Sequence, residues 1–400
     1  MIDTSSAPPL RPQASLGVLD ATEWFGETSG GIRTYLREKS RFVAARPHLR
    51  QSIVVPGDQD AISDESGVRL FRLRGPAIPR HKPYRVMLSW RSLARIVRHE
   101  RPHIIEVGSP FMVPWLLSPE AKRQGIPMVS FHHTDVAGVL SRVVGGSATT
   151  QRRLTKATWA YLRQLDRLFS ATIVATRGGA DELRREGIER VEHVPLGVDL
   201  TTFTSARRQD REATRHAHGL PEGPLAGYVG RFAREKELHV VLDGWAHVER
   251  TTGARLVLVG AGPEEARLRA HPYGPRVLFV PYLQERDALA DLLAALDVYV
   301  APGPAETFGL SAVEAMACGT PVLSAHRGAV AEHVLRSGGG LTYEAGNASA
   351  VAAQGVRIFD ADLTQLGERA EGFATAEHGW PTVLNQLFAV YQRVVDGRES

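Results

Sequence analysis

The sequence predicts an α/β protein built from two similar halves. Short runs rich in β-branched residues alternate with segments of helical length through most of the 400 residues, a pattern typical of a parallel sheet with helices on both faces. The alternation starts again near residue 225, after a polar stretch at 195–222 that lacks strand character. We therefore expect two domains joined by a linker at 195–222.

The elements of each half follow from these runs. In the first half, strands are predicted at 15–20, 51–57, 103–108, 127–133 and 171–176, and helices at 30–46, 88–100 and 146–170. In the second half, strands are predicted at 225–230, 255–260, 277–281, 297–302 and 320–325, and helices at 238–251, 264–271, 288–296 and 309–317.

The predicted domain bounds follow from the same pattern. Residues 1–14 are rich in Pro and Ser and are expected to form a flexible tail. The first α/β domain is predicted at 15–200 and the second at 201–380. A last helix at 381–400 has an apolar face that needs a partner, so we expect it to cross back to the first domain.

Composition excludes several classes of protein. The one cysteine, Cys318, excludes an internal disulfide and a metal site built from several cysteines. It fits a reducing compartment, and its apolar helical surroundings predict core packing. No run reaches the roughly 18 apolar residues of a membrane-spanning helix, and residues 1–14 lack the apolar segment of a signal peptide. We expect a cytoplasmic protein.

Basic residues are concentrated in the first half. Lys and Arg exceed Asp and Glu in residues 1–200, and much of that excess lies in 79–103, where it is interleaved with apolar and aromatic side chains. One interpretation is a half-buried helix with a solvated arginine face. The other is a patch that meets anionic lipid or a phosphorylated acceptor. No nucleic-acid-binding motif accompanies the charge, so nucleic acid is not an expected partner.

Two segments of the second half suit an anionic ligand. Gly230 ends a predicted strand, and Arg231 and Lys236 follow it in a loop, where they could hold phosphate oxygens. Glu306 precedes the predicted helix at 309–317, and Glu314 lies about one turn inside it. Free amides at a helix start bind anions, and paired carboxylates accept hydrogen bonds from sugar hydroxyls. Each pattern taken singly also fits a solvated surface or a first-turn glutamate.

Four segments in a fixed order resemble the donor domain of glycosyltransferase family 4, also described as glycosyl transferases group 1. They are GRFAREK (230–236), LVLVGAGP (256–263), APGPAETFGLSAVEAMACGTPVL (301–323) and RGAVAEHV (327–334). Three further segments resemble the family's N-terminal glycine loop, acceptor-domain histidine and interdomain strand, namely SGGIRTYL (29–36), SFHHTD (130–135) and VPLGVD (194–199). The resemblance implies a GT-B fold, with two Rossmann-like domains facing a central cleft.

The resemblance also implies roles for single residues. Arg231 and Lys236 would hold the diphosphate of the donor and stabilise it as the leaving group. Glu306 would hold the donor sugar, Glu314 the ribose hydroxyls, and His133 would lie over the transferred sugar, with His132 left open as its alternative. The expected catalytic residues are therefore Glu306, His133, Arg231 and Lys236. The expected donor-binding residues are Gly30, Gly31, Gly230, Arg231, Lys236, Pro281, Tyr282, Leu283, Glu306, Phe308, Gly309, Leu310 and Glu314.

The implied reaction is retaining transfer of a hexose from a GDP-mannose or UDP-glucose type donor to a lipid-linked, glycan or small-molecule acceptor. Neither a cofactor nor a metal is expected, because fixed cations and helix amides stabilise the leaving group. Two Asp-x-Asp sequences, at 58–60 and 360–362, match the letters of a metal motif but lie in a polar loop and at a helix cap. Peripheral contact with an anionic membrane remains open.

Other classes remain as alternatives. A sugar-nucleotide epimerase or a phosphorylase of GT-B-like fold would need no sugar acceptor or would respond to inorganic phosphate. A nicotinamide-dependent oxidoreductase predicts Gly-x-Gly-x-x-Gly after a strand, whereas Gly260 and Gly262 are followed by Glu265 at the third position. A non-catalytic binding protein would bind a nucleotide without turnover.

Overall fold

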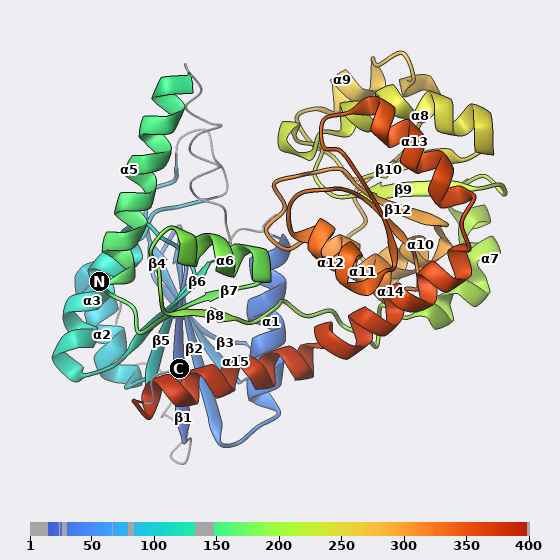
Figure 1. Cartoon of the computed structure of the whole chain (residues 1–400). Helices are drawn as coiled ribbons and strands as arrows, with labels where there is room; N and C mark the ends of the chain where they lie inside the picture. Colours follow the sequence, from blue (N-terminus) through green and yellow to red (C-terminus); the bar gives the residue numbers. More distant parts are fainter. Residues whose placement is uncertain are drawn as a thin grey trace. The chain divides into compact units, whose positions relative to one another are not determined.

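The computed structural model describes residues 15–23, 25, 30–65, 67–78, 84–132 and 148–397. These residues form two compact units (Figure 1). Unit 2 is Pro195–Val383, and unit 1 combines the chain up to Val194 with the residues from Leu384 onward. Each unit contains one largely parallel sheet with helices, which confirms the predicted α/β class with two halves. The predicted cleft between the halves stays a prediction.

Unit 1 has an eight-stranded sheet in the order β3-β4-β2-β1-β5-β6-β7-β8. Its strands are β1 (Leu16–Ala21), β2 (Leu49–Gly57), β3 (Ala61–Glu65), β4 (Val68–Arg74), β5 (Ile104–Val107), β6 (Met128–His132), β7 (Ala171–Val174) and β8 (Val191–His193). Its helices are α1 (Gly30–Ala44), α2 (Trp90–Glu100), α3 (Met112–Gln124), α5 (Ala148–Asp166) and α6 (Arg177–Arg185).

The sequence did not predict the edge of this sheet. Strand β3 is antiparallel to β4, whereas the other strand pairs of unit 1 are parallel. Strand β3 is half-buried or exposed along its whole length, so it has no apolar run to mark it. Strand β4 alternates Arg with apolar residues, and its apolar members, including Phe71 and Leu73, are buried in the core.

Unit 2 has a parallel six-stranded sheet in the order β11-β10-β9-β12-β13-β14. Its strands are β9 (Leu225–Val229), β10 (Arg255–Val259), β11 (Leu278–Val280), β12 (Val298–Ala301), β13 (Val322–Ala325) and β14 (Gly340–Tyr343). Its helices are α7 (Arg211–Ala217), α8 (Leu238–Thr252), α9 (Glu265–Arg269), α10 (Arg286–Ala295), α11 (Leu310–Ala317), α12 (Ala329–Ser337), α13 (Ala348–Phe359) and α14 (Leu363–His378), with 3-10 turns η1 (Ser205–Asp210), η2 (Arg234–Lys236) and η3 (Gly274–Arg276). Helix α15 (Trp380–Val395) starts in unit 2 and continues into unit 1.

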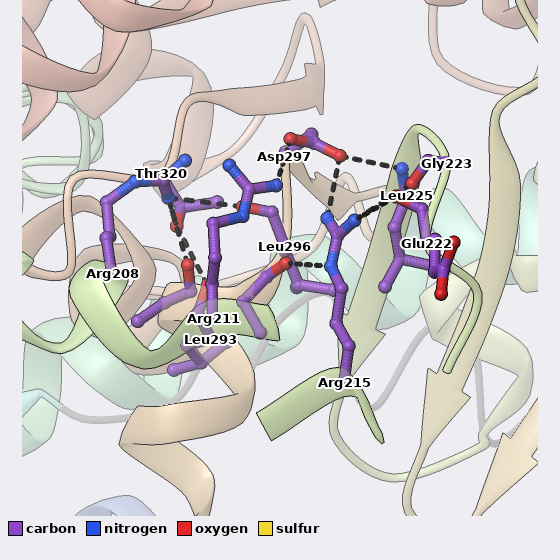
Figure 2. A network of polar contacts seen from close by, with 12 residues as sticks. Arg208, Arg211, Arg215, Glu222, Gly223, Leu225, Leu293, Leu296, Asp297 and Thr320 are labelled. Atoms are coloured by element: carbon purple, nitrogen blue, oxygen red, sulfur yellow. Dashed lines mark hydrogen bonds and ion pairs between the residues drawn. The ribbon is translucent and has the colours of Figure 1, made fainter. Parts of the chain in front are cut away.

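The segment predicted as a polar linker, 195–222, packs onto unit 2. Its elements η1 and α7 both contact α10. Two of its arginines, Arg208 and Arg215, donate to backbone carbonyls at the end of α10 (Figure 2). Arg208 donates to Leu296 O at 3.2 Å, and Arg215 donates to Ala295 O at 2.9 Å. Guanidinium groups at a helix C-terminus satisfy carbonyls that have no partner within the helix.

Asp297 completes this arrangement at the start of β12. Its two carboxylate oxygens accept from Arg211 and Arg215, and Oδ2 also accepts from the Leu225 amide at 2.8 Å (Figure 2). Arg215 is buried although it is charged. Its hydrogen bonds to three carbonyls and to this carboxylate offset the cost of removing the charge from water. The segment 195–222 is therefore an ordered part of unit 2.

A buried charged cluster ties α15 to the sheet of unit 1. Lys39 of α1 is fully buried and lies 2.5 Å from Asp20 Oδ1 and 3.4 Å from Glu106 Oε2. The Lys39 ammonium also donates to Tyr391 Oη at 2.7 Å, and Tyr391 in turn donates to Glu106. Tyr35 Oη donates to Glu106 Oε1 at 2.9 Å. Burial raises the pKa of Glu106, although Lys39 opposes that shift.

Much of the basic stretch 79–103 forms helix α2, which has one buried face and one exposed face. The apolar residues Leu93, Ile96 and Val97 are buried in the core, while Arg91 and Arg98 are exposed. This arrangement fits the half-buried helix with a solvated arginine face, and contact with anionic lipid stays a prediction. Residues 79–83 lie outside the described residues. Among the helices that the structure describes, none is both long and apolar enough to cross a membrane.

Candidate active site

Two glycines shape the loops that follow β9 and β10. Gly230 has φ +152° and donates its amide to Val259 O at 3.0 Å. Gly260 has φ +139°, and a Cβ at that position would lie 2.1 Å from Gly230 O. Only residues without a side chain allow these two backbones to approach so closely. The loop that carries Arg231 and Lys236 therefore lies against the loop after β10.

The two predicted cations of this loop have different partners. Arg231 is largely exposed and pairs with Glu235 at 2.8 Å on the surface. Lys236, in the turn η2, is partly buried and forms an ion pair with Glu306. These two residues lie 70 positions apart, in the loops that follow β9 and β12, and the sheet pairs β9 with β12 directly. Parallel topology brings both groups to the carboxyl ends of adjacent strands.

The loop from Glu306 to α11 is held in a defined shape. Glu306 O accepts from the Ala329 amide at 3.1 Å, which ties the loop to the start of α12. Gly309 caps α11 with φ +79°, and a Cβ there would lie 2.3 Å from Val330 Cγ2. A side chain at residue 309 would therefore strain the backbone and clash with α12. Leu310 begins α11 directly after this glycine.

An aromatic cluster supports this loop from the core side. Phe308 is buried, and its ring centroid lies 5.0 Å from that of His333 and 5.5 Å from that of His378. His333 Nε2 donates to Phe308 O at 2.9 Å. The sequence did not identify the two histidines as parts of the site, although His333 lies in 327–334, one of the four segments that resemble the family.

Glu314 is buried in α11 and, within the part of the chain that the structure describes, has one cationic partner. Arg286, the first residue of α10, places its guanidinium nitrogen 3.3 Å from Glu314 Oε1. Burial raises the pKa of Glu314 to about 7, Arg286 opposes the shift, and Asp199 adds to it. The carboxyl group therefore changes its charge near neutral pH.

Tyr299 links the two carboxylates electrostatically. It is buried in β12, and its hydroxyl bonds to Val229 O at 3.1 Å and to Ser311 Oγ at 2.7 Å. Burial raises the pKa of Tyr299, and the charges of Glu306 and Glu314 raise it further. Both carboxylates therefore lie near enough to affect the Tyr299 hydroxyl, and Glu306 also pairs with Lys236.

The loop predicted to read the base follows β11. Pro281 and Tyr282 are exposed, with 67% of the Tyr282 surface accessible, and Leu283 is half-buried. The last residue of β11, Val280, accepts the Gly260 amide at 3.0 Å. Residues 281–283 therefore start beside the loop that contacts Gly230.

The predicted residues of unit 1 are described only in part. Gly30 and Gly31 form the first turn of α1. His132 ends β6, and His133 lies outside the described residues. Glu23, which the sequence did not single out, is buried just after β1 and accepts from the Met87 amide and from Ser109 Oγ, each at 3.2 Å. Burial raises the pKa of Glu23.

The two Asp-x-Asp sequences have other partners in the structure. Asp60 Oδ1 accepts the Arg74 amide at 2.8 Å, and Asp362 caps α14 by accepting the Gln365 amide at 3.0 Å. Within the described ranges, no group of three or more His, Cys, Asp or Glu side chains could hold a metal ion. Cys318 is buried at the end of α11, as predicted for core packing.

Comparisons with known proteins agree with these features. The family model described as Glycosyltransferase Family 4 matches residues 29–202, and that described as Glycosyl transferases group 1 matches residues 223–361. A GDP-mannose-dependent alpha-(1-6)-phosphatidylinositol dimannoside mannosyltransferase of Mycobacterium tuberculosis is 31% identical over 80% of this chain and 82% of that protein. A GDP-mannose-dependent alpha-mannosyltransferase of the same species is 29% identical over 85% of each chain.

Solved structures show the same fold. Sucrose-phosphate synthase from Thermosynechococcus elongatus superposes with a TM-score of 0.72 at 23% identity, covering 96% of this chain and all of that one. The glycosyltransferase WaaG, involved in lipopolysaccharide biosynthesis, gives a TM-score of 0.68 at 15% identity, with 92% and 98% covered. The fold is that of GT-B glycosyltransferases, and the protein is an enzyme of this class. The chain belongs to glycosyltransferase family 4, the glycosyl transferases group 1.

Proposed function

We propose that the protein is a retaining, metal-independent mannosyltransferase that uses GDP-mannose as its donor. The two mannosyltransferase relatives, both named for GDP-mannose, support this donor. The observation that carries the proposal is the pairing of Lys236 with Glu306 at the carboxyl ends of β9 and β12, beside the buried Glu314. This strand edge is where open α/β sheets bind ligands.

The residues of unit 2 suit the chemistry of a leaving nucleotide diphosphate. Breaking the bond to the anomeric carbon leaves negative charge on the diphosphate, which Arg231 and Lys236 would stabilise. Lys236 and Glu306 form an ion pair with each other, so we infer that each would exchange this partner for the donor on binding. Lys236 would turn to phosphate and Glu306 to sugar hydroxyls, with the amides of Phe308, Gly309 and Leu310 alongside.

Retention of configuration would follow from attack on the same face that the nucleotide leaves. The β-phosphate would accept the proton of the acceptor hydroxyl as the new bond forms. His133 would lie over the transferred sugar, and Gly30 and Gly31 would approach the diphosphate from unit 1. We propose that these roles, taken from the family resemblance, apply to this chain.

For the acceptor we propose a lipid-linked glycan at the inner face of the membrane. One relative is named for a phosphatidylinositol dimannoside acceptor. In unit 1, Leu88 and Trp90 are about half exposed, at 49% and 56%, and Arg91 lies over the Trp90 ring at 5.4 Å. Exposed aromatic and basic side chains together favour contact with anionic lipid.

The first test follows nucleotide release from GDP-mannose, UDP-glucose, UDP-galactose and UDP-GlcNAc in separate reactions that contain EDTA. We expect slow hydrolysis of GDP-mannose, and faster release once phosphatidylinositol mannosides are added. Glu306→Ala and Lys236→Ala should each abolish both, whereas Arg267→Ala, which removes an exposed ion pair with Glu264, should not. Absence of nucleotide binding by the unaltered enzyme would refute the proposal.

The same assay separates the alternatives. A sugar-nucleotide epimerase would convert its donor without any acceptor, and a phosphorylase would respond to inorganic phosphate. For the membrane contact, flotation with phosphatidylinositol vesicles at low salt should carry the enzyme, and the double variant L88A/W90A should remain behind. Equal flotation of both proteins would exclude this surface as the contact.

A further inference from the structure

We propose that Arg286 is a positioning residue that keeps Glu314 available as a charged acceptor for the ribose hydroxyls of the donor. The inference rests on the proposed function and adds to it a residue that acts through Glu314. Arg286 itself would not touch the reacting atoms. Its role would be to fix both the orientation and the charge of the carboxylate that reads the ribose.

The placement of Arg286 is unusual for a helix. It is the first residue of α10, where the positive end of the helix dipole disfavours a cation. It is held there by contacts from two other elements. Its guanidinium lies 4.8 Å above the ring of Phe203, which is fully buried, and it lies 3.3 Å from Glu314 Oε1. An arginine in a position that its own helix disfavours indicates a role outside that helix.

Glu314 depends on this cation for its charge. Among the described residues, Arg286 is the one side chain that donates a hydrogen bond to it. The other groups that face Glu314 are Asp199 in the loop before η1, Tyr299 of β12 and Cys318 at the end of α11. None of these supplies a positive charge.

Asp199 opposes Arg286. Its burial alone would raise the pKa of Asp199, but hydrogen bonds from Thr201 and Thr202 lower it, so Asp199 stays negative. Its charge favours the neutral acid form of Glu314. Arg286 favours the ionised form of Glu314. Three effects therefore set the charge on Glu314 at neutral pH. Arg286 favours the ionised form, whereas Asp199 and burial favour the neutral acid.

Ribose binding needs the ionised form. A carboxylate accepts hydrogen bonds at both oxygens, whereas a carboxylic acid offers a donor in place of one acceptor. Nucleotide affinity should therefore rise as pH increases through about 7 in the unaltered enzyme. Loss of Arg286 removes a group that lowers the pKa of Glu314, so the midpoint should move to higher pH.

The test is a calorimetric titration of GDP onto the full-length enzyme and its variants from pH 6 to pH 9. If loss of Arg286 moves the midpoint up by about one pH unit, we expect R286Q to bind GDP about fivefold more weakly at pH 7. The deficit should shrink toward pH 9. R286K keeps the positive charge and should restore most of the unaltered profile, which a purely structural role of the guanidinium would not predict.

Three controls make the outcome specific. R336Q removes a similar arginine, which pairs with Glu377 at 2.6 Å and lies 5.1 Å above Phe373, and should leave the profile unchanged. GDP itself titrates in this range, and its contribution is subtracted from the measured pH dependence of GDP affinity. In E314Q the remaining pH dependence should be flat. A dideoxy-GDP probe, which lacks both ribose hydroxyls, should bind R286Q and the unaltered enzyme equally.

The possible failures are distinct. If the unaltered enzyme binds neither GDP nor UDP, the proposed function is wrong. If it binds GDP but R286Q shows the same pH profile, or loses affinity equally at every pH, the role of Arg286 is refuted. If R286Q does not fold, R286M, which also lacks the positive charge but keeps an apolar side chain of similar length, replaces it, and the same two outcomes refute the role.

Discussion

Two buried glutamates, one in each unit, differ in how their charge is satisfied. In unit 1, Glu106 accepts hydrogen bonds from two tyrosine hydroxyls and lies 3.4 Å from the Lys39 ammonium. In unit 2, Glu314 has only Arg286, at 3.3 Å, among the residues that the structure describes. Burial raises the pKa of both carboxyl groups.

The comparison shows that burial and a raised pKa do not by themselves mark a functional carboxylate. Three side chains hold the Glu106 carboxylate, because Tyr35 and Tyr391 donate to it and the Lys39 ammonium lies beside it. Glu314 lies in α11 and has one side-chain donor, Arg286, among the described residues, which leaves it spare acceptor capacity. The number of partners, rather than the burial, separates the structural group from the candidate binding group.

The largest effect is expected from breaking the cluster in unit 1. Lys39→Ala would leave Asp20 and Glu106 buried without their cation, and removal of one member of a buried ion pair costs about 3–5 kcal/mol. We expect a large drop in melting temperature, measured by circular dichroism. Arg41→Ala removes the exposed pair with Glu38 and should change stability by less than about 1 kcal/mol. Equal effects of the two variants would break the comparison.

The second prediction concerns the pH dependence of stability through Glu314. Its pKa rises from 4.5 to about 7 on folding, so the folded state binds more protons than the unfolded state between these values. Stability of the unaltered protein is therefore lost as pH increases through this window, by up to about 3 kcal/mol. Glu314→Gln lacks this loss, so its melting temperature relative to the unaltered protein should be higher at pH 8 than at pH 4.5. A pH-independent difference would contradict this.

The smallest expected effect on stability is the difference between removing the hydroxyl of Tyr391 and removing that of Tyr343. Tyr391→Phe removes the hydroxyl that bonds both Lys39 and Glu106, and leaving such groups unsatisfied costs about 1–3 kcal/mol. The hydroxyl of Tyr343 is buried with no hydrogen-bond partner in the described structure, so Tyr343→Phe should be neutral or slightly stabilising. Urea unfolding of both variants measures the difference. A larger loss for Tyr343→Phe would overturn the interpretation of the cluster.

Much of the fold could be predicted because buried strands consist of runs of apolar residues, which are visible in the sequence. Strands β9, β10 and β12 are nearly or completely buried and were found to within a residue or two. The edge strand β3 could not be found, because exposure removes the apolar signal. The segment 195–222 was predicted as a linker because its arginines look solvated. Their hydrogen bonds to carbonyls of α10 join residues about 80 positions apart, which local patterns do not reveal.

The candidate site could be predicted only as a list of residues with local signals. Glu306, Lys236 and Gly309 stand in recognisable segments, and the structure adds that Lys236 contacts Glu306. Arg286 carried no comparable signal, because its relevance comes from a tertiary contact with Glu314. His333 stands in the recognisable segment 327–334, but its contact with Phe308 is tertiary and could not be read from that segment. The role of His133 stays a prediction.

Helix α15 has a consequence for the order in which the protein is made. Unit 2 is continuous in the chain, whereas unit 1 needs Leu384 and the residues after it to complete its core. On the ribosome, residues 15–194 emerge first but must wait for Tyr391, and until then the Lys39 cluster lacks a partner. The first unit to be translated is therefore the last to be finished, and a premature stop codon before residue 384 would damage the unit furthest from it in sequence.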